Sequence, residues 1–405
     1  MATRSKDLRT GRSVWEYGRA ASVPYRPLRR DSETEVLVVG AGITGAMVAD
    51  MLSAEGFEVA VVDRRGPAKG STTASTALVQ YEIDTPLVTL SRRIGRRDAV
   101  RAWRRSRLAV EALAVRLGEL GVGFERRDSL YLAGDLLDAE ALKGECDARL
   151  AAGFASRLVA RQELRAVFGI RAAAAILSHG GFVIDPRAAT CAMLRSASDV
   201  GAVIHAPVRV MDIDARMSRV VATCENGRRI RASHLVLATG YEFPKHVSQR
   251  GHKIASTWAI ATVRQRRKLW PGECMIWEAA DPYLYVRTTP DGRVICGGED
   301  EPFSDEDRRD ALIAEKTARL RRKLARLLPA IDTRVDFAWT GSFGQSATGL
   351  PTIGPVPGMP RCWAALGYGG NGTTYSRLAA EIITGEFAGR PDTDSDLFTF
   401  ARQRR

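Results

Sequence analysis

The chain has few of the residues that metal sites and disulfide frameworks require. Its 405 residues include six cysteines, at positions 146, 191, 224, 274, 296 and 362, and no C-x-x-C pair. Its five histidines form no H-E-x-x-H motif, and the closest two in sequence are His246 and His252. This spacing excludes the compact zinc and disulfide patterns. We therefore expect no metal site, and cysteines that pack in the core.

Long apolar runs are also missing. No stretch approaches the roughly 18 apolar residues that a membrane-spanning helix needs, and the first thirty residues lack the apolar segment of a secretory signal. Hydrophobic residues make up 45% of the chain and charged residues 26%, which is typical of a globular protein. We therefore expect a cytoplasmic enzyme.

Lysine is scarce, so the net charge of +13 comes from arginine. Eight arginines lie between Arg92 and Arg107, and four lie between Arg319 and Arg326 together with Lys323. Each cluster falls on an expected helix, where a solvated helix face is the simpler interpretation and a surface for nucleic acid or an acidic partner is the alternative. The sequence has no aromatic stacking pattern and no zinc finger beside them, so we favour the solvated face.

A glycine-rich turn follows the first expected strand. Residues 35–39 form a short apolar run suited to a buried parallel strand, and residues 46–55 have a helical pattern. Between them, Gly40-Ala-Gly-Ile-Thr-Gly45 matches G-x-G-x-x-G, whose glycines allow a tight turn, close approach of a pyrophosphate and close packing of helix on strand. Asp63 closes the second expected strand, where an acid accepts hydrogen bonds from ribose hydroxyls and repels a 2′-phosphate. This unit predicts FAD or NAD and disfavours NADP.

Three further segments fit the same type of cofactor. Residues 70–76 (Gly-Ser-Thr-Thr-Ala-Ser-Thr) carry hydroxyls that could line a diphosphate, although an exposed loop is the alternative. Residues 237–240 (Leu-Ala-Thr-Gly) end a strand with small side chains. Residues 367–372 (Gly-Tyr-Gly-Gly-Asn-Gly) open the last expected helix, and N–H groups there could stabilise negative charge on a reduced flavin. Asp185-Pro186 supplies the start signal of another helix.

In this order and combination, the motifs resemble those of the D-amino-acid oxidase superfamily of flavoproteins, from about residue 33 to residue 390. Members of this superfamily include the glycine oxidases, the sarcosine oxidases and the γ-glutamylputrescine oxidases. The early arm, with Trp15, is most similar to the γ-glutamylputrescine oxidase-like branch. The resemblance implies FAD as the cofactor and oxidation of a C–N bond. The residues it implies around FAD are Gly40, Gly42, Ile43, Thr44, Gly45, Asp63, Arg64, Ser71, Thr72, Val208, Gly240, Gly370, Asn371, Gly372 and Thr373.

The dinucleotide-type segments occur at the start, middle and end of the sequence. We therefore predict an α/β fold, in which a discontinuous Rossmann-like FAD-binding domain carries an inserted antiparallel β-sheet substrate domain flanked by helices. The predicted bounds are an N-terminal arm at 1–32, the FAD-binding domain at 33–95, 180–245 and 338–390, the substrate-binding domain at 96–179 and 246–337, and a C-terminal tail at 391–405.

Departures from the resemblance concern the substrate. Phe343 stands where amino-acid oxidases of this type place an Arg that binds the substrate carboxylate, and Gly370 stands where glycine oxidases have another Arg. A simple α-amino acid is therefore not the favoured substrate. The substrate-binding candidates are Tyr283, Tyr285, Arg287 and Phe343; Arg287 is either an alternative anion clamp or a structural residue. No catalytic residue is assigned.

The function we expect is hydride transfer from an amine or N-substituted amino acid to flavin N5, followed by hydrolysis of the imine. The electron acceptor is oxygen or a quinone or protein carrier, because Ile295-Cys296 replaces the oxygen-activating Lys of the sarcosine oxidases. Two alternatives stay open. One is an NAD-dependent dehydrogenase that uses the same glycine motif, and the other is a non-catalytic or tRNA-associated flavoprotein that uses the arginine clusters.

Overall fold

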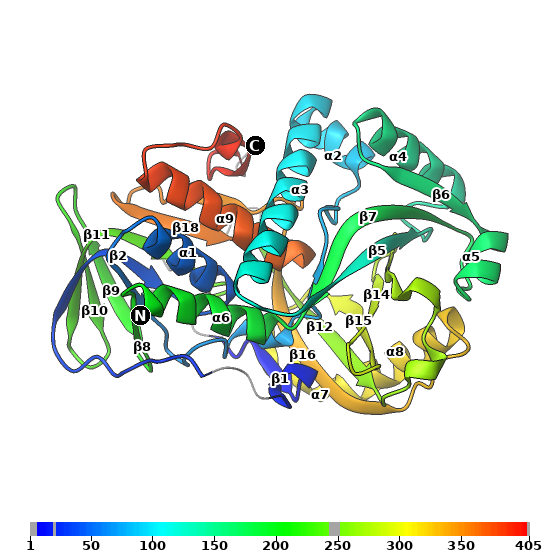
Figure 1. The fold of residues 1–405 in the computed structure, drawn as a ribbon, viewed down its shortest axis with the longest axis horizontal. Coiled ribbons are helices and arrows are strands. Elements are labelled where there is room, and N and C mark those ends of the chain that lie inside the picture. The colour runs from blue at the N-terminus through cyan, green and yellow to red at the C-terminus, as the bar shows by residue number, and fades with distance from the viewer. Residues whose placement is uncertain (1–5, 19–21, 243–251, 403–405) are drawn as a thin grey trace.

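The computed structural model describes residues 6–18, 22–242 and 252–402. In these residues two sheets form, one of eight strands and one of ten. Figure 1 shows the two sheets side by side, each with helices packed against it. The helices within the described ranges include none that is long and apolar enough to cross a membrane.

The eight-stranded sheet has the order β17-β18-β11-β2-β3-β8, with β10 attached to β11 and β9 attached to β10. The five strands from β18 to β8 pair in parallel, and β17 pairs antiparallel at the edge. The bounds are β2 Ser32–Val39, β3 Val59–Val62, β8 Val203–His205, β9 Val210–Ala215, β10 Val220–Cys224, β11 Arg229–Leu237, β17 Thr352–Pro355 and β18 Cys362–Leu366.

Both faces of this sheet are covered. Val36 and Val38 point into the core formed with the helices, whereas Leu37 and Val39 pack against the residues of β9 and β10. Because a strand covered on both faces needs apolar residues at every position, β2 appears in the sequence as a continuous apolar run. The helices on the first face, visible in Figure 1, are α1 Ile43–Ala54, α6 Pro186–Asp199 and α9 Gly372–Phe387.

The ten-stranded sheet has the order β1-β16-β12-β15-β14-β13-β5-β7-β4, with β6 paired to β7. Its neighbours pair antiparallel, except for the parallel pair of β13 and β5. The strand bounds are β1 Arg9–Gly11, β4 Leu78–Val79, β5 Phe124–Leu132, β6 Ser156–Ala160, β7 Ala174–Ile184, β12 His252–Thr262, β13 Met275–Glu278, β14 Leu284–Thr288, β15 Val294–Glu301 and β16 Val335–Ser346. The remaining helices are α2 Leu87–Ile94, α3 Arg96–Glu119, α4 Ala139–Ala151, α5 Arg161–Val167, α7 Glu306–Ala311 and α8 Ile313–Leu327.

The described part of the N-terminal arm packs on the body of the protein. Its strand β1 pairs with residues Trp339–Gly341 of β16. A guanidinium nitrogen of Arg309 donates a hydrogen bond of 2.8 Å to the carbonyl of Asp7. Leu8 is 4% exposed, and its carbonyl accepts a hydrogen bond from the backbone N–H of Ser342. The arm thus adds an edge strand to the ten-stranded sheet.

Two predicted elements differ in the structure. The apolar pattern of the sequence predicts one helix over residues 84–120, beginning at Asp84, but Gly95, with φ of 85°, separates α2 from α3. That left-handed conformation interrupts a helix and suits glycine. Residues 229–238 read as two strands but form the single strand β11, whose first half pairs with β10 and whose second half pairs with β18.

Three distant parts of the chain meet in the eight-stranded sheet: residues 32–62, 203–237 and 352–366. The division of the chain into domains stays a prediction. Its boundary at residue 338 falls inside β16, which pairs with β12 from Val335 to Ser346.

Candidate functional site

A cavity of about 240 Å³ runs from the carboxyl ends of the parallel strands onto the ten-stranded sheet. Val39 and Val62 line it where β2 and β3 end, and Tyr285 and Phe343 line it from the ten-stranded sheet. In open parallel sheets, ligands bind beyond the carboxyl ends of the strands. The cavity has the position and the two-walled form of a cofactor and substrate site.

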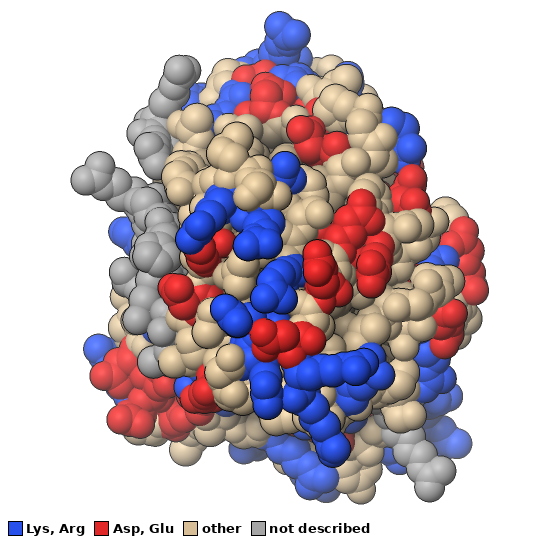
Figure 2. Space-filling model, turned by 90° about the vertical axis from the view of Figure 1, so that its left-hand side faces the viewer, with Lys and Arg blue, Asp and Glu red and all other residues tan. Residues whose placement is uncertain are grey.

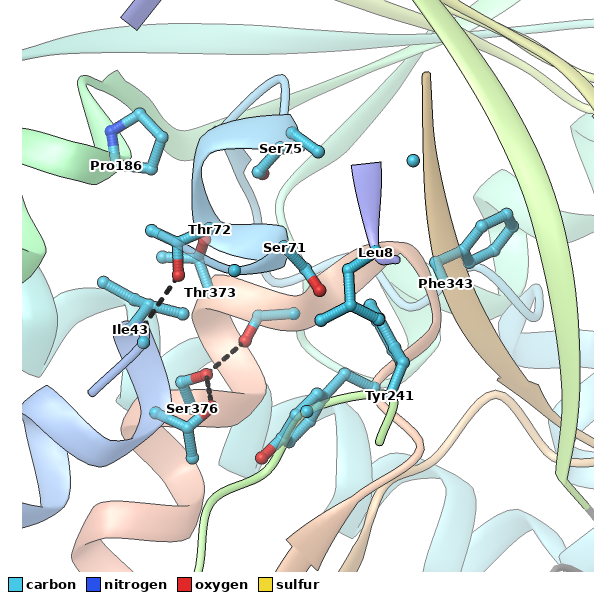
Figure 3. Close-up of a pocket in the computed structure, with 18 of the residues that line it drawn as sticks. Leu8, Ile43, Ser71, Thr72, Ser75, Pro186, Tyr241, Phe343, Thr373 and Ser376 are labelled. Carbon is cyan, nitrogen blue, oxygen red and sulfur yellow. Dashed lines mark hydrogen bonds between the residues drawn. The ribbon is translucent and has the colours of Figure 1, made fainter. Parts of the chain in front are cut away.

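The glycine turn is closely packed against its own helix. A Cβ atom on Gly45 would lie 1.8 Å from the carbonyl oxygen of Gly40, and one on Gly40 would lie 2.3 Å from the carbonyl oxygen of Ala238. The backbone N–H of Ile43 donates a 3.0 Å hydrogen bond to Oγ1 of Thr72, as Figure 3 shows. These contacts bring the N-terminus of α1 and the hydroxylated segment together at one wall, where helix N–H groups favour an anionic group.

Asp63 lies at the end of β3 and shapes the next loop. Its Oδ2 accepts a hydrogen bond of 2.8 Å from the N–H of Ala41, and its Oδ1 accepts bonds from the N–H groups of Arg65 and Gly66, at 2.7 and 2.8 Å. An anionic carboxylate oxygen can accept more than one hydrogen bond. Asp63 therefore holds the glycine turn and lines the cavity with acceptor capacity left at Oδ2, while a hydrogen bond to a ribose hydroxyl stays a prediction.

Two hydroxyl groups in the cavity wall have no hydrogen-bond partner among the residues that the structure describes. They are Oγ of Ser71 and Oγ1 of Thr239, both buried and both on residues that line the cavity. A buried polar group without a partner costs free energy, so such groups indicate an absent ligand. Together with the glycine turn and Asp63, they fit the diphosphate and ribose of a dinucleotide.

The wall opposite α1 is the start of α9. The hydroxyls of Thr44 and Ser376 lie 2.8 Å apart and join the two helices. Just before α9, Nδ2 of Asn371 donates a 2.8 Å hydrogen bond to the carbonyl of Glu82. The N–H of Gly370 donates a 2.6 Å hydrogen bond to Oδ2 of Asp84. The last glycine motif is therefore anchored to residues 82–84, and both segments border the cavity.

The cavity brings the predicted cofactor residues together. Gly45 is the exception, since it lies beneath the turn and packs against Gly40. The predicted residues that line the cavity are Gly40, Gly42, Ile43, Thr44, Asp63, Arg64, Ser71, Thr72, Val208, Gly240, Gly370, Asn371, Gly372 and Thr373. Their assignment to individual groups of the cofactor stays a prediction.

Three of the four substrate candidates also line the cavity: Tyr283, Tyr285 and Phe343. The rings of the two tyrosines have centroids 5.2 Å apart, and the hydroxyl of Tyr285 lies 3.3 Å from Oγ1 of Thr257. Burial raises the pKa of both tyrosines, with a further rise from the charge of Asp300. This end of the cavity is aromatic and keeps its phenols neutral.

Arg287 lies elsewhere and does not line the cavity. Its guanidinium donates hydrogen bonds to the carbonyls of Thr76, Ala77, Ile184 and Thr288, at 3.3, 2.9, 2.8 and 2.9 Å. Its side chain is 1% exposed. An arginine whose nitrogens are bound to backbone carbonyls joins chain segments, so these contacts favour the structural alternative over the anion clamp.

Several residues at the cavity were missed by the sequence analysis. Leu8 comes from the arm, which lies outside the resemblance, and Tyr241 directly follows the predicted Gly240. Asp84 was read as the first residue of a helix, but α2 begins at Leu87 and leaves Asp84 in the cavity wall. The signal for Asp84 was Pro86, because a proline disfavours helix in the residue before it and fits the first turn of a helix.

Two carboxyl groups near the aromatic end have raised pKa values. Burial raises the pKa of Asp84 to about 6, against the opposing effect of the Gly370 N–H. Burial raises the pKa of Asp300 to about 7, while the hydroxyl of Thr257 lowers it and the charge of Asp84 adds to the rise. Carboxyl groups that titrate near neutral pH can accept a proton from a bound amine.

The arginine clusters are largely occupied by partners within the chain. On α3, Arg101 pairs with Asp98, Asp394 and Asp396, and Arg105 pairs with Glu381 and Asp392. Figure 2 shows that on the face at the left of Figure 1, too, acidic side chains lie among the basic ones. These contacts favour the solvated, ion-paired interpretation of the charge.

The residues that line the cavity in the described part of the chain include no cysteine and no histidine. The six cysteines are unpaired and buried. Within residues 6–18, 22–242 and 252–402, no three His, Cys, Asp or Glu side chains are grouped so as to hold a metal ion. His246 lies outside the described residues.

Comparison with known proteins extends over most of the chain. The model of the family described as FAD dependent oxidoreductase (DAO) matches residues 35–385. The chain is similar to the tRNA 5-methylaminomethyl-2-thiouridine biosynthesis bifunctional protein MnmC of Cupriavidus necator, with 25% identity over 404 residues that cover 90% of this chain and 59% of that protein. The protein of the same name from Burkholderia multivorans is 25% identical over 399 residues, covering 91% and 58%. The chain thus spans less than two thirds of the length of these relatives.

Solved structures share the fold at lower identity. Glycine oxidase from Geobacillus kaustophilus superposes with a TM-score of 0.74 and 20% identity, covering 89% of this chain and 96% of that one. L-proline dehydrogenase from P. horikoshii superposes with a TM-score of 0.74 and 18% identity, covering 92% and 99%. The predicted α/β fold, with its FAD-binding part and its second sheet, is confirmed.

Proposed function

The chain belongs to the DAO family of FAD-dependent oxidoreductases, and from this premise we propose that it oxidises a C–N bond of an amine or of an N-substituted amino acid. Its cofactor is FAD, which excludes the alternative of an NAD-dependent dehydrogenase. The observation that carries the proposal is the continuity of the cavity, which runs from the glycine turn of Gly40 to the tyrosine pair of Tyr283 and Tyr285. A substrate at the tyrosines would therefore lie directly beside the end of a cofactor held by the glycine turn.

The proposed reaction depends mainly on the orientation of the substrate and on the exclusion of water from the site. When bound, FAD accepts the electron pair that leaves the α-carbon of the amine as hydride. The amine must be neutral at that step, and the carboxylate of Asp84, in the cavity wall, is placed to take its proton. Tyr283, Tyr285 and Phe343 exclude water and orient the α-carbon. The imine product then takes up water and yields a carbonyl compound and a free amine.

A second candidate is action on an amine carried by a tRNA. It is favoured by the similarity to proteins whose name includes tRNA 5-methylaminomethyl-2-thiouridine biosynthesis. The ion pairs of Arg101 and Arg105 within the chain count against the arginine clusters as a nucleic-acid surface. If the candidate holds, the protein binds tRNA with an affinity that falls steeply as salt is raised.

The proposal is tested by the visible spectrum of the purified holoprotein under anaerobic conditions. We expect a panel of primary and secondary amines to include one class that bleaches the flavin band. Readmitting air then separates an oxidase, which recovers its colour, from a dehydrogenase that needs a quinone or protein acceptor. A holoprotein that no amine bleaches, and that only an aminomethylated tRNA reduces, would favour the second candidate.

A further inference from the structure

We propose that the aromatic end of the cavity binds the ammonium group of a substrate that carries no carboxylate beside it, through the carboxylate of Asp84, with the charge of the buried Asp300 behind the cavity wall adding to the attraction. The substrate class is then a cationic alkylamine rather than an amino acid. This inference deepens the function proposed above and rests on it for the place of the reaction.

Asp84 presents a carboxylate to the cavity without a basic partner. It lines the cavity, and its Oδ2 accepts the 2.6 Å hydrogen bond from the N–H of Gly370. Its own N–H donates to Oδ1 of Asn371 at 3.2 Å, which fixes its backbone. None of the ion pairs among the described residues includes Asp84. One backbone N–H leaves most of the acceptor capacity of a carboxylate unused.

Asp300 is a second carboxylate behind the same wall. Both of its carboxylate oxygens are shut off from solvent, and neither has a hydrogen-bond partner of good geometry. Its charge acts on Tyr283 and Tyr285, and Asp84 acts on all three groups. The hydroxyl of Thr257, which lines the cavity, lies between this carboxyl group and the tyrosines, since it contacts Tyr285 and lowers the pKa of Asp300.

Several other buried carboxylates of the described residues have basic partners, whereas Asp185 and Glu278 accept hydrogen bonds from backbone N–H groups instead. Glu82 and Glu145 both bind Arg149, at 2.6 and 2.8 Å, and Asp50 binds Arg116 at 2.7 Å. A buried carboxylate without a cation pays a desolvation penalty that a partner reduces. In a chain with 60 basic and 47 acidic residues, neither Asp84 nor Asp300 has a basic partner among the described residues, and the ammonium group of a ligand would supply one.

A bulge in β15 and its contacts with α8 hold Asp300 in place. Glu299 has φ of 60° and stands in a bulge of β15 opposite β12, with register shifting between Ser256 and Trp258. Lys316 of α8 donates a 2.9 Å hydrogen bond to the carbonyl of Glu299, and Lys323 binds its carboxylate at 2.6 Å. The second basic cluster of the sequence therefore fixes the bulge that carries Asp300.

Among the described residues, the surroundings of this end suit a cation better than a carboxylate. Aromatic faces such as those of Tyr283 and Tyr285 attract an ammonium group. The basic residues that line the cavity within the described ranges are Arg64, Arg65 and Arg209. Arg64 and Arg65 are tied to Glu242 and to the carbonyl of Lys6 and follow Asp63 at the cofactor end. Phe343 and Gly370 take the places where the resemblance has arginine.

The test compares two ions of equal shape and opposite charge on the FAD-loaded protein: tert-butylammonium and pivalate. Neither has a hydrogen on the carbon that carries the charged group, so neither can be oxidised by hydride loss. Binding is followed by calorimetry and by the change in the flavin spectrum. We expect tert-butylammonium to bind and pivalate to bind at least about tenfold more weakly or not at all.

Variants then locate the site. Asp84→Asn and Asp300→Asn keep the side-chain shape and should each weaken tert-butylammonium by about tenfold or more. Asp281→Asn is the matched control, because Asp281 is exposed and acts on Asp300 only through its charge; it should leave the affinity within about twofold. The proposal is overturned if pivalate binds to the unaltered protein as tightly as tert-butylammonium does. This comparison does not depend on the variants, so it remains decisive even if a variant loses FAD.

The outcomes separate this inference from the proposed function. If amines bleach the flavin but both Asn variants bind tert-butylammonium normally, the inference is wrong and the function stands. If tert-butylammonium binds through Asp84 and Asp300 but no amine bleaches the flavin, the cation site stands and the function is wrong.

Discussion

The indole Nε1 of Trp15 donates a hydrogen bond of 2.7 Å to the backbone carbonyl of Ser75. Ser75 belongs to the hydroxylated segment that lines the cavity, whereas Trp15 belongs to the N-terminal arm and is 6% exposed. The guanidinium of Arg287 lies over the same indole ring, 5.3 Å from its centroid. The arm is therefore fastened directly to a wall of the cofactor cavity.

Replacing Trp15 by Phe should weaken the attachment of the arm, because the indole N–H is lost while an aromatic ring remains. The carbonyl of Ser75 loses its donor, which should cost about 1 kcal/mol of unfolding free energy and reduce the fraction of FAD retained after gel filtration. The measurements are urea unfolding and the ratio of flavin to protein absorbance. Tyr17→Phe is the control, because Tyr17 is 64% exposed. Equal losses in both variants would contradict the link between arm and cofactor.

A methyl group on Gly45 should abolish FAD binding. Its Cβ would lie 1.8 Å from the carbonyl oxygen of Gly40, so the turn must move away from the cofactor. We expect Gly45→Ala to be purified colourless or to fail to fold. Gly118→Ala on α3 is the control, since a Cβ there meets nothing within 4 Å. That substitution should add roughly 0.5 to 1 kcal/mol of helix stability. A yellow Gly45→Ala protein would refute the assigned packing.

Arg287→Lys should lower stability and leave cation binding unchanged. An ammonium group cannot reach the four carbonyls that the guanidinium binds. The expected loss is roughly 1 to 3 kcal/mol in unfolding free energy, with the Kd for tert-butylammonium unaltered. Arg264→Lys, at an arginine that is 62% exposed, controls for the exchange itself. An unchanged unfolding free energy together with altered ligand binding would restore the anion-clamp interpretation.

The stability of the protein should depend on pH through Asp300. Its folded-state pKa of about 7 exceeds its usual value of 3.8. Between these values the folded state keeps a proton that the unfolded state has released, so the unfolding free energy falls as pH rises through this window. The charges of Asp84 and Asp281 strengthen the effect and that of Lys316 opposes it.

Asp300→Asn removes this titration. Relative to the unaltered protein, the variant should gain stability at pH 8, by at most about 4 kcal/mol, and should differ little at pH 4. Urea unfolding at the two pH values measures the difference, and Asp281→Asn serves as the control for charge alone. Identical pH profiles for Asp300→Asn and the unaltered protein would show that the carboxyl group is not buried as described.

Phe343→Arg should introduce an anion site. Phe343 lines the cavity from β16, so a guanidinium there would face the substrate space. We expect pivalate to bind to the Arg variant and not to a Phe343→Leu control, with calorimetry as the measurement. Failure of the Arg variant to gain pivalate binding, with FAD still bound, would place the substrate elsewhere.

The cofactor end was predictable from the sequence because its signals are local. The glycines from Gly40 to Gly45 lie between a strand and a helix that the apolar pattern reveals, and Asp63 follows at a fixed offset. The start of α6 at Pro186 was equally predictable, since the residue that caps the helix, Asp185, is adjacent in the sequence. The placement of α2 and α3 as one helix was wrong because Gly95 fits a helix pattern when its φ is unknown.

The substrate end was less predictable because its contacts join distant segments. The partners of Arg287 come from residues 76–77 and 184, which no spacing rule links to β14. Asp300 owes its position to a bulge between β15 and β12, and the register of that pair is a tertiary property. Leu8 reaches the cavity only because β1 pairs with β16, about 330 residues away.

The parallel pairing of β2 with β11, and of β11 with β18, sets a sequence of events during synthesis. About 190 residues separate the end of β2 from the start of β11, which at about 5 to 20 residues per second takes roughly 10 to 40 seconds on the ribosome. During that interval, the nascent β2–β3 unit has an unpaired apolar edge where β11 will bind. An unpaired apolar edge of this kind promotes aggregation, and a flavin that arrives before Thr373 has been translated meets a cavity that still lacks part of its wall.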